Sequence, residues 1–192
     1  MKKQENIILS SIKELKNLKS LIVLSLLIAL NISLGIFTIP LPFGATVGIS
    51  FVAIASAGYL FGPVCAGTAA ALCDIIKYIL HPTGPFNPGF TICAIIGGFI
   101  YGIFLYKKNV TIKNCIFAKV FIALIVNITL NTLFISLTYG KSFWGILPLR
   151  IVKNITCIPV ETVILYHFLR FVIEPIKDMA FSKGANIKPI AK

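Results

Sequence analysis

Three polar residues, Arg150, Lys153 and Asn154, interrupt a long apolar stretch near the C-terminal end of the chain. Helical positions i, i+3 and i+4 lie on one face, so the two cations and the amide would point the same way. If that helix crosses a bilayer, each cation costs about 2.5–3.5 kcal/mol near the membrane centre unless it meets a partner, water or an anion. The spacing indicates a site for an anionic or polar group. For Lys153 the alternative is a side chain that extends to the outer interface.

The same spacing recurs earlier, at Asp74, Lys77 and Tyr78. Two interpretations are open for this face. Asp74 either forms an internal ion pair, with Lys77 or with Arg150, or contributes to a ligand site. Ionisable groups inside membrane spans are costly enough that both interpretations assign them a definite partner.

A stripe of amides lies on the apolar stretch over 115–138, at Asn127 and Asn131, and Thr138 continues it. At 100° per residue these side chains fall on one side of a helix. They either make hydrogen bonds between helices or form one wall of a pocket together with Arg150 and Asn154.

The segment 81–90 reads HPTGPFNPGF. Three prolines and two glycines predict an ordered turn, because each restricts or permits specific backbone angles. This turn would hold Phe86, Asn87 and Phe90 over the mouth of a site. The alternative is a rigid linker between two helices.

Composition excludes most soluble functions. Hydrophobic residues make up 57% of the 192 residues and charged residues only 12%, which is typical of an integral membrane protein. The net charge of +12 does not indicate nucleic-acid binding, because the cations gather beside the apolar stretches as the positive-inside rule requires. They are Lys2, Lys3, Lys13, Lys16 and Lys19 at the start, Lys107, Lys108, Lys113 and Lys119 around one loop, and Arg170, Lys177, Lys183, Lys188 and Lys192 at the end.

No residue pattern predicts catalysis. The five cysteines and two histidines lack metal-ligand spacing. Gly140-Lys141-Ser142 resembles the end of a phosphate-binding loop, but Ile135 stands where the first glycine of that loop belongs. We therefore expect no enzyme activity, no cofactor and no bound metal or ATP.

The apolar pattern predicts an all-α integral membrane protein with six transmembrane helices in one bundle. The expected spans are 20–39, 45–61, 63–80, 90–106, 115–138 and 145–172, with a bend at Pro159. We expect a basic interfacial segment over 1–19, a membrane domain over 20–174 and a cytoplasmic basic tail over 175–192. Six spans and the placement of the cations predict a multi-pass protein of the cell membrane with both termini in the cytoplasm.

Small residues recur at four-residue spacing, which lets helices approach closely. They are Ser25, Ala29 and Ser33 on the first span, Ala66 and Ala70 on the third, and Gly98 and Gly102 on the fourth. We expect the third and fourth spans to pack within the bundle. The first stripe either does the same or contacts another membrane subunit.

Three stretches together resemble the substrate-binding (S) components of energy-coupling factor (ECF) vitamin transporters, and among them the folate family. They are Ala71–Asp74 with Lys77–Leu80, Pro82–Thr91 running into Gly97–Gly102, and Arg150–Asn154 followed by Pro159. The resemblance implies a six-helix subunit that binds a vitamin from outside and docks on a transmembrane coupling protein with two ATPases. It also implies a docking motif of two alanines four residues apart on the first helix, where this chain has Ser25 and Ala29.

Within this resemblance, the predicted folate site has distinct parts. Arg150 and Lys153 would meet the anionic or polar groups, Asn154 and Asn131 the ring edges, and Phe86 or Phe90 would cover the ligand. Asp74, Lys77 and Asn87 complete the predicted site. The alternatives are an S component for another flat vitamin such as thiamine or riboflavin, and a structural membrane protein.

Overall fold

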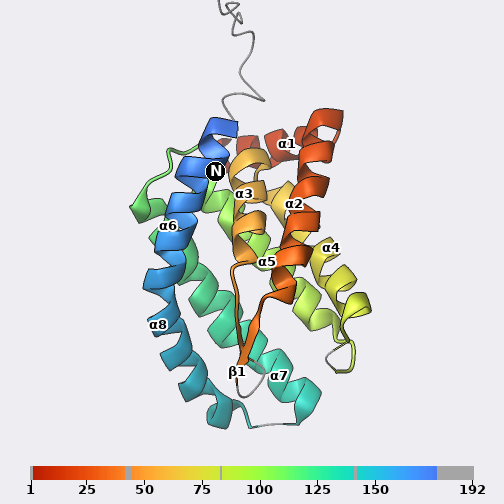
Figure 1. The fold of residues 1–192 in the computed structure, drawn as a ribbon, viewed down its shortest axis with the longest axis vertical. Coiled ribbons are helices and arrows are strands. Elements are labelled where there is room, and N and C mark those ends of the chain that lie inside the picture. Colours follow the sequence, from red (N-terminus) through yellow and green to blue (C-terminus); the bar gives the residue numbers. More distant parts are fainter. Residues whose placement is uncertain (1, 42–44, 83, 141, 177–192) are drawn as a thin grey trace, which may run out of the picture.

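The computed structural model describes residues 2–41, 45–82, 84–140 and 142–176, and these form a helical bundle with one short β-hairpin (Figure 1). The elements in chain order are α1 (Lys2–Glu14), α2 (Leu18–Ile36), β1 (Ile39–Leu41), β2 (Ala45–Val47), α3 (Phe51–Phe61), α4 (Pro63–Leu80), α5 (Pro88–Leu105), α6 (Ile112–Phe121), the π-helix η2 (Ile122–Leu130), α7 (Asn131–Tyr139), α8 (Phe143–Phe168) and the π-helix η3 (Leu169–Ile173).

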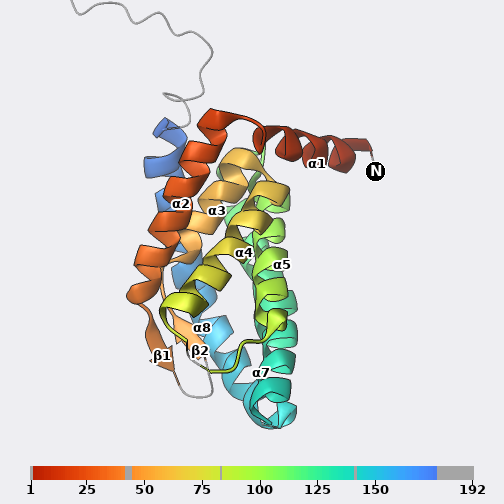
Figure 2. The same cartoon turned by 90° about the vertical axis from the view of Figure 1, so that its right-hand side faces the viewer.

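Five helical segments are long and apolar enough to cross a membrane, and α3 is a sixth, shorter apolar helix. This agrees with the predicted six-helix bundle. The start of α2 and the end of α8 lie at one end of the bundle. The hairpin and the α4–α5 and α7–α8 connections lie at the other (Figures 1 and 2). Both chain ends therefore leave from the same end of the bundle, as an even number of spans requires.

The predicted second span over 45–61 is wrong in its first part. Residues 45–47 are a strand that pairs antiparallel with 39–41, with Ile39 opposite Val47, and α3 begins only at Phe51. A short apolar run with β-branched residues does not distinguish strand from helix by its periodicity. With 11 residues, α3 is about 16 Å long, about half the hydrocarbon thickness.

Helix α1 lies across one end of the bundle instead of running along it (Figure 2). Its buried Ser11 donates a hydrogen bond to the carbonyl of Phe61 at 2.7 Å and accepts from the amides of Val64 at 3.1 Å and Cys65 at 3.2 Å. The position before α4 is Gly62, which has φ +89° and no side chain to cap the helix. Ser11 therefore supplies from α1 the capping oxygen that α4 lacks.

The small residues of α4 and α5 let these two helices pack closely, as predicted. A Cβ at Gly98 would collide with the carbonyl of Ala66, and one at Gly102 would collide with Pro63. The stripe on α2 differs, because Ser25, Ala29 and Ser33 are all exposed. The buried residues of α2, Ser20, Leu24, Leu27 and Asn31, lie on another face.

The last two spans contain features that the sequence did not indicate. The predicted helix over 115–138 has a π-helical middle, and residues 112–139 form one long span around it. The following helix runs through Pro148 and Pro159 without ending, so the bend at Pro159 stays a prediction. The predicted tail over 175–192 lies outside the described residues from position 177 onward, and the interfacial role of 1–19 also stays a prediction.

Candidate functional site

A cavity of about 740 Å³ lies near the hairpin end of the bundle, between α2, α4, α5 and the span that contains η2 and α7. Six of the residues predicted to bind ligand line it, and they come from four different segments. They are Asp74, Lys77, Phe86, Asn87, Phe90 and Asn131. The fold thus brings together residues that are up to 57 positions apart in the sequence.

The α4–α5 loop is fixed over this cavity by its own hydrogen bonds. Tyr78 donates from its hydroxyl to the carbonyl of Gly84 at 2.9 Å, and its ring lies 5.0 Å from that of Phe86. Asn87 caps α5 by accepting from the amide of Gly89 at 2.8 Å, and it donates to Thr138 Oγ1 at 2.6 Å. The predicted ordered turn is therefore present, and Phe86 remains half exposed at 50%.

Phe90 lies in the first turn of α5 and also lines the cavity. Its ring packs edge to face with Phe134 of α7, with the centroids 6.4 Å apart. Together with Phe86 and Tyr139, it gives the cavity flat aromatic surfaces that suit a planar ligand.

Asp74 and Lys77 line the cavity without pairing with each other. The Asp74 carboxylate accepts a hydrogen bond from Thr91 Oγ1 at 2.7 Å. In the part of the chain that the structure describes, Asp74 and Lys77 do not come within 4.0 Å as an ion pair. The predicted ion pair between Asp74 and Lys77 is therefore wrong.

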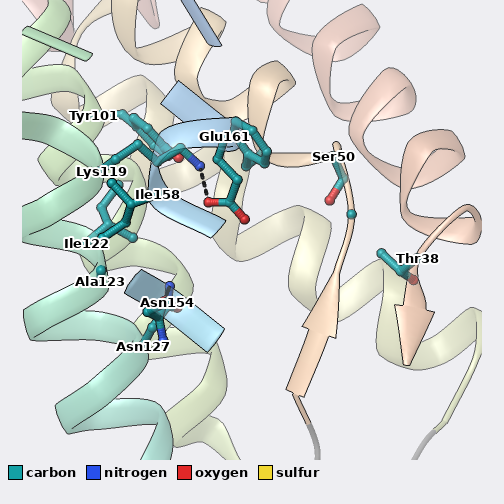
Figure 3. A pocket seen from close by; sticks show the side chains of 12 residues that line it. Thr38, Ser50, Tyr101, Lys119, Ile122, Ala123, Asn127, Asn154, Ile158 and Glu161 are labelled. Carbon is teal, nitrogen blue, oxygen red and sulfur yellow. Dashed lines mark hydrogen bonds and ion pairs between the residues drawn. The ribbon is translucent and has the colours of Figure 1, made fainter. Parts of the chain in front are cut away.

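A second cavity of about 200 Å³ adjoins the first, since Thr38 and Ser50 line both (Figure 3). It contains an ion pair between Lys119 Nζ and Glu161 Oε2 at 2.9 Å. Lys119 is only 4% exposed, and its ammonium group also lies over the ring of Phe51. The sequence placed Lys119 beside a cytoplasmic loop, and this expectation is wrong. Its partner is 42 positions away, so spacing within one helix gives no signal for the pair.

The three residues of the predicted cluster, Arg150, Lys153 and Asn154, lie in different environments. Asn154 lines the smaller cavity, Arg150 is 6% exposed behind it, and Lys153 is partly buried. Neither cation is among the described residues that line either cavity. Contact of these two cations with a ligand therefore stays a prediction.

Arg150 instead joins α8 to η2. Its Nη1 donates to the carbonyl of Asn127 at 3.1 Å, and its own carbonyl accepts from Asn154 Nδ2 at 2.8 Å. Asn127 Nδ2 in turn donates to Asn154 Oδ1 at 3.0 Å, and Asn131 donates to Asn127 at 3.4 Å. The asparagines bond between helices, as the first interpretation of the amide stripe requires, and they also line the two cavities, with Asn154 but without Arg150. π-Helical segments often occur at functional sites.

The sequence of this chain matches a known family over most of its length. The profile of the family described as "ECF transporter, substrate-specific component" matches residues 19–168. The chain belongs to this family. It is a multi-pass membrane S component, a binding subunit of a transporter and not an enzyme.

Two relatives of this S component share the same name. The "Folate transporter FolT" of Clostridium novyi (strain NT) is 34% identical over 120 residues, which cover 62% of this chain and 70% of that protein. The protein of the same name from Streptococcus mutans serotype c is 28% identical over 132 residues, covering 65% of this chain and 71% of that one. A crystal structure of FolT bound with folic acid superposes with a TM-score of 0.74 at 30% identity, covering 79% of this chain and 93% of that one.

Sequence reasoning on this S component missed residues in and beside the cavities. Thr38 and Ser50 line both cavities, and Thr91 bonds Asp74 without lining either; all three are ordinary hydroxyl residues with no distinguishing spacing. The predicted docking residues Ser25, Ala29 and Ser33 do not line either cavity. Their exposure on α2 leaves that face available to lipid or to another subunit.

Proposed function

We propose that this chain binds folate from outside the cell and delivers it to an ATP-driven transport module. The observation that carries the proposal is the larger cavity, where aromatic rings, an amide, a carboxylate and an ammonium group meet. Folate offers matching chemistry, since it has a flat pterin ring with hydrogen-bonding edges and a tail with two carboxylates. The structural relative bound to folic acid, at 30% identity, supports the same ligand.

In this proposal Phe86 and Phe90 stack on or cover the ring, while Asn131, Asn154 and Asp74 meet its polar edges. Asn87 holds the loop through its bonds to Gly89 and Thr138. Arg150 acts as a positioning residue, because its side chain bonds the carbonyl of Asn127 in η2 and does not line the cavity. Contact of Arg150 and Lys153 with the ligand stays a prediction.

We further propose that the partners are a transmembrane coupling subunit and two ATPases, with Ser25, Ala29 and Ser33 on the docking face. Binding alone cannot move a vitamin across a membrane, because a ligand shifts a conformational equilibrium only by its differential affinity for the two states. Release at the cytoplasmic side therefore requires work from the partner. The placement of the cations supports cytoplasmic termini in the cell membrane, so that the hairpin end, with the larger cavity, faces outside.

Calorimetric titration of the purified protein with folate, thiamine and riboflavin tests the ligand. Folate is expected to bind, and thiamine and riboflavin are expected to give no saturable heat. Tighter binding of thiamine or riboflavin would assign the chain to another flat vitamin. Absence of binding for all three would favour a structural role.

A further inference from the structure

We infer that Lys77 recognises the glutamate tail of folate and is the residue that distinguishes folates from ligands with the ring alone. This inference rests on the proposed function and adds a role for one side chain. Among the described residues that line the larger cavity, Lys77 is the only lysine or arginine. Of the cations near the smaller cavity, Lys119 pairs with Glu161 and Arg150 bonds the Asn127 carbonyl, while Lys153 lines neither cavity.

Among the described residues, no carboxylate lies within ion-pair distance of the ammonium group of Lys77. Asp74, three residues earlier, accepts its hydrogen bond from Thr91 at 2.7 Å and lies beyond ion-pair distance of Lys77 in the described part of the chain. A half-buried ammonium group without a counter-ion favours an anion that enters the cavity. A ligand carboxylate meets this requirement.

The position of Lys77 along α4 fits the tail better than the ring. Helix α4 runs toward the hairpin end of the bundle (Figure 2), so Lys77 lies one turn, about 4.5 Å, nearer the mouth than Asp74. His81, which also lines the cavity, lies one turn further out. Burying a dianionic tail is far more costly than burying a neutral ring, so the tail is expected to stay near the mouth, where Lys77 is within reach.

The Lys77 side chain packs against Gly35 of α2. A Cβ at Gly35 would lie 2.7 Å from Lys77 Cε and 3.0 Å from Nζ. The lysine stem therefore passes directly over the glycine at the end of α2, and both residues line the cavity. A methyl group at this position would move the ammonium group without removing its charge.

The experiment compares folate with pteroate in the form of its primary amide, which has the same ring and linker but neither the glutamate nor a free carboxylate. Lys77→Met is expected to weaken folate binding about tenfold and to leave pteroate amide binding unchanged, because one charge-assisted hydrogen bond is lost. Lys77→Arg keeps the charge and is expected to retain most of the preference for folate. Lys13→Met, which removes an exposed lysine on α1, is the matched control and should change neither affinity.

Equal losses for folate and pteroate amide, or no loss for either, would overturn the role of Lys77. Failure of the unaltered protein to bind folate would instead overturn the proposed function, so the two failures are distinguishable. If Lys77→Met does not fold, Gly35→Ala provides the second test. It is expected to lower the folate preference by displacing the lysine, and an unchanged preference in that variant would contradict the inference.

Discussion

In the smaller cavity Lys119 and Glu161 meet at 2.9 Å, whereas in the larger cavity Asp74 and Lys77 stay apart although they are three residues apart on one helix. The first two charges satisfy each other and join α6 to α8. In the larger cavity the Asp74 carboxylate accepts a hydrogen bond from the neutral Thr91, and the Lys77 ammonium group is left for a ligand. The difference indicates that charge in the smaller cavity stabilises the bundle, and charge in the larger cavity serves binding.

The largest effect is expected from breaking the buried pair. Lys119→Met alone should destabilise the protein by about 3–5 kcal/mol, because it leaves the Glu161 carboxylate in a low-dielectric site without its cation. The double variant Lys119→Met with Glu161→Leu should recover most of that loss. Thermal unfolding in detergent measures both.

The matched comparison for this prediction is Lys77→Met, which removes a lysine of the larger cavity. It should change the unfolding temperature much less than Lys119→Met. If the two lysine variants were equally destabilised, the contrast between the cavities would be lost.

A smaller effect is expected where the Arg150 side chain on α8 bonds the carbonyl of Asn127 in η2. Arg150→Ala should weaken folate binding by tenfold or more, about 1.4 kcal/mol, because the span that carries Asn127 and Asn131 loses this bond to α8. Calorimetric titration measures the change, and Val152→Ala, on an exposed position of the same helix, is the control. Unchanged affinity in the arginine variant would restrict Arg150 to a role in packing.

The smallest effect is expected in the loop over the larger cavity. Phe86→Ala should weaken folate and pteroate amide by a similar factor, about two- to tenfold, since one aromatic contact contributes about 0.5–1.5 kcal/mol. The unfolding temperature should hardly change, because the ring is half exposed. A loss confined to folate would place Phe86 at the tail instead of the ring.

Prediction from the sequence was most accurate for features whose indicating residues all lie within one helix or one loop. Apolar length gave the helical spans, and the glycines of α5 indicated its close contact with α4. Turn chemistry identified the loop with Phe86 and Asn87, which the hydrogen bonds then explain. The sequence signal for each of these features lies within one helix or one loop.

The remaining features depend on residues that meet only in the folded chain. Lys119 and Glu161 are on different helices, and so are Asp74 and its partner Thr91. The π-helix also changes which side chains of its span face the cavities, and no composition signal announces it. Helical spacing also put Arg150, Lys153 and Asn154 on one face, but of these three only Asn154 lines a cavity, and contact of Arg150 with the ligand stays a prediction.

The Ser11 hydroxyl limits how far the chain can be shortened at its start without destabilising the bundle. The segment shared with the family begins at residue 19, yet the first amides of α4 are capped by a side chain eight positions before that point. A chain shortened to the shared segment would lose this cap, and losing a cap destabilises a helix by about 1 kcal/mol. The helix affected is the one that carries Asp74 and Lys77. Helix α1 thus helps to stabilise the bundle, although it lies before the segment that matches the family.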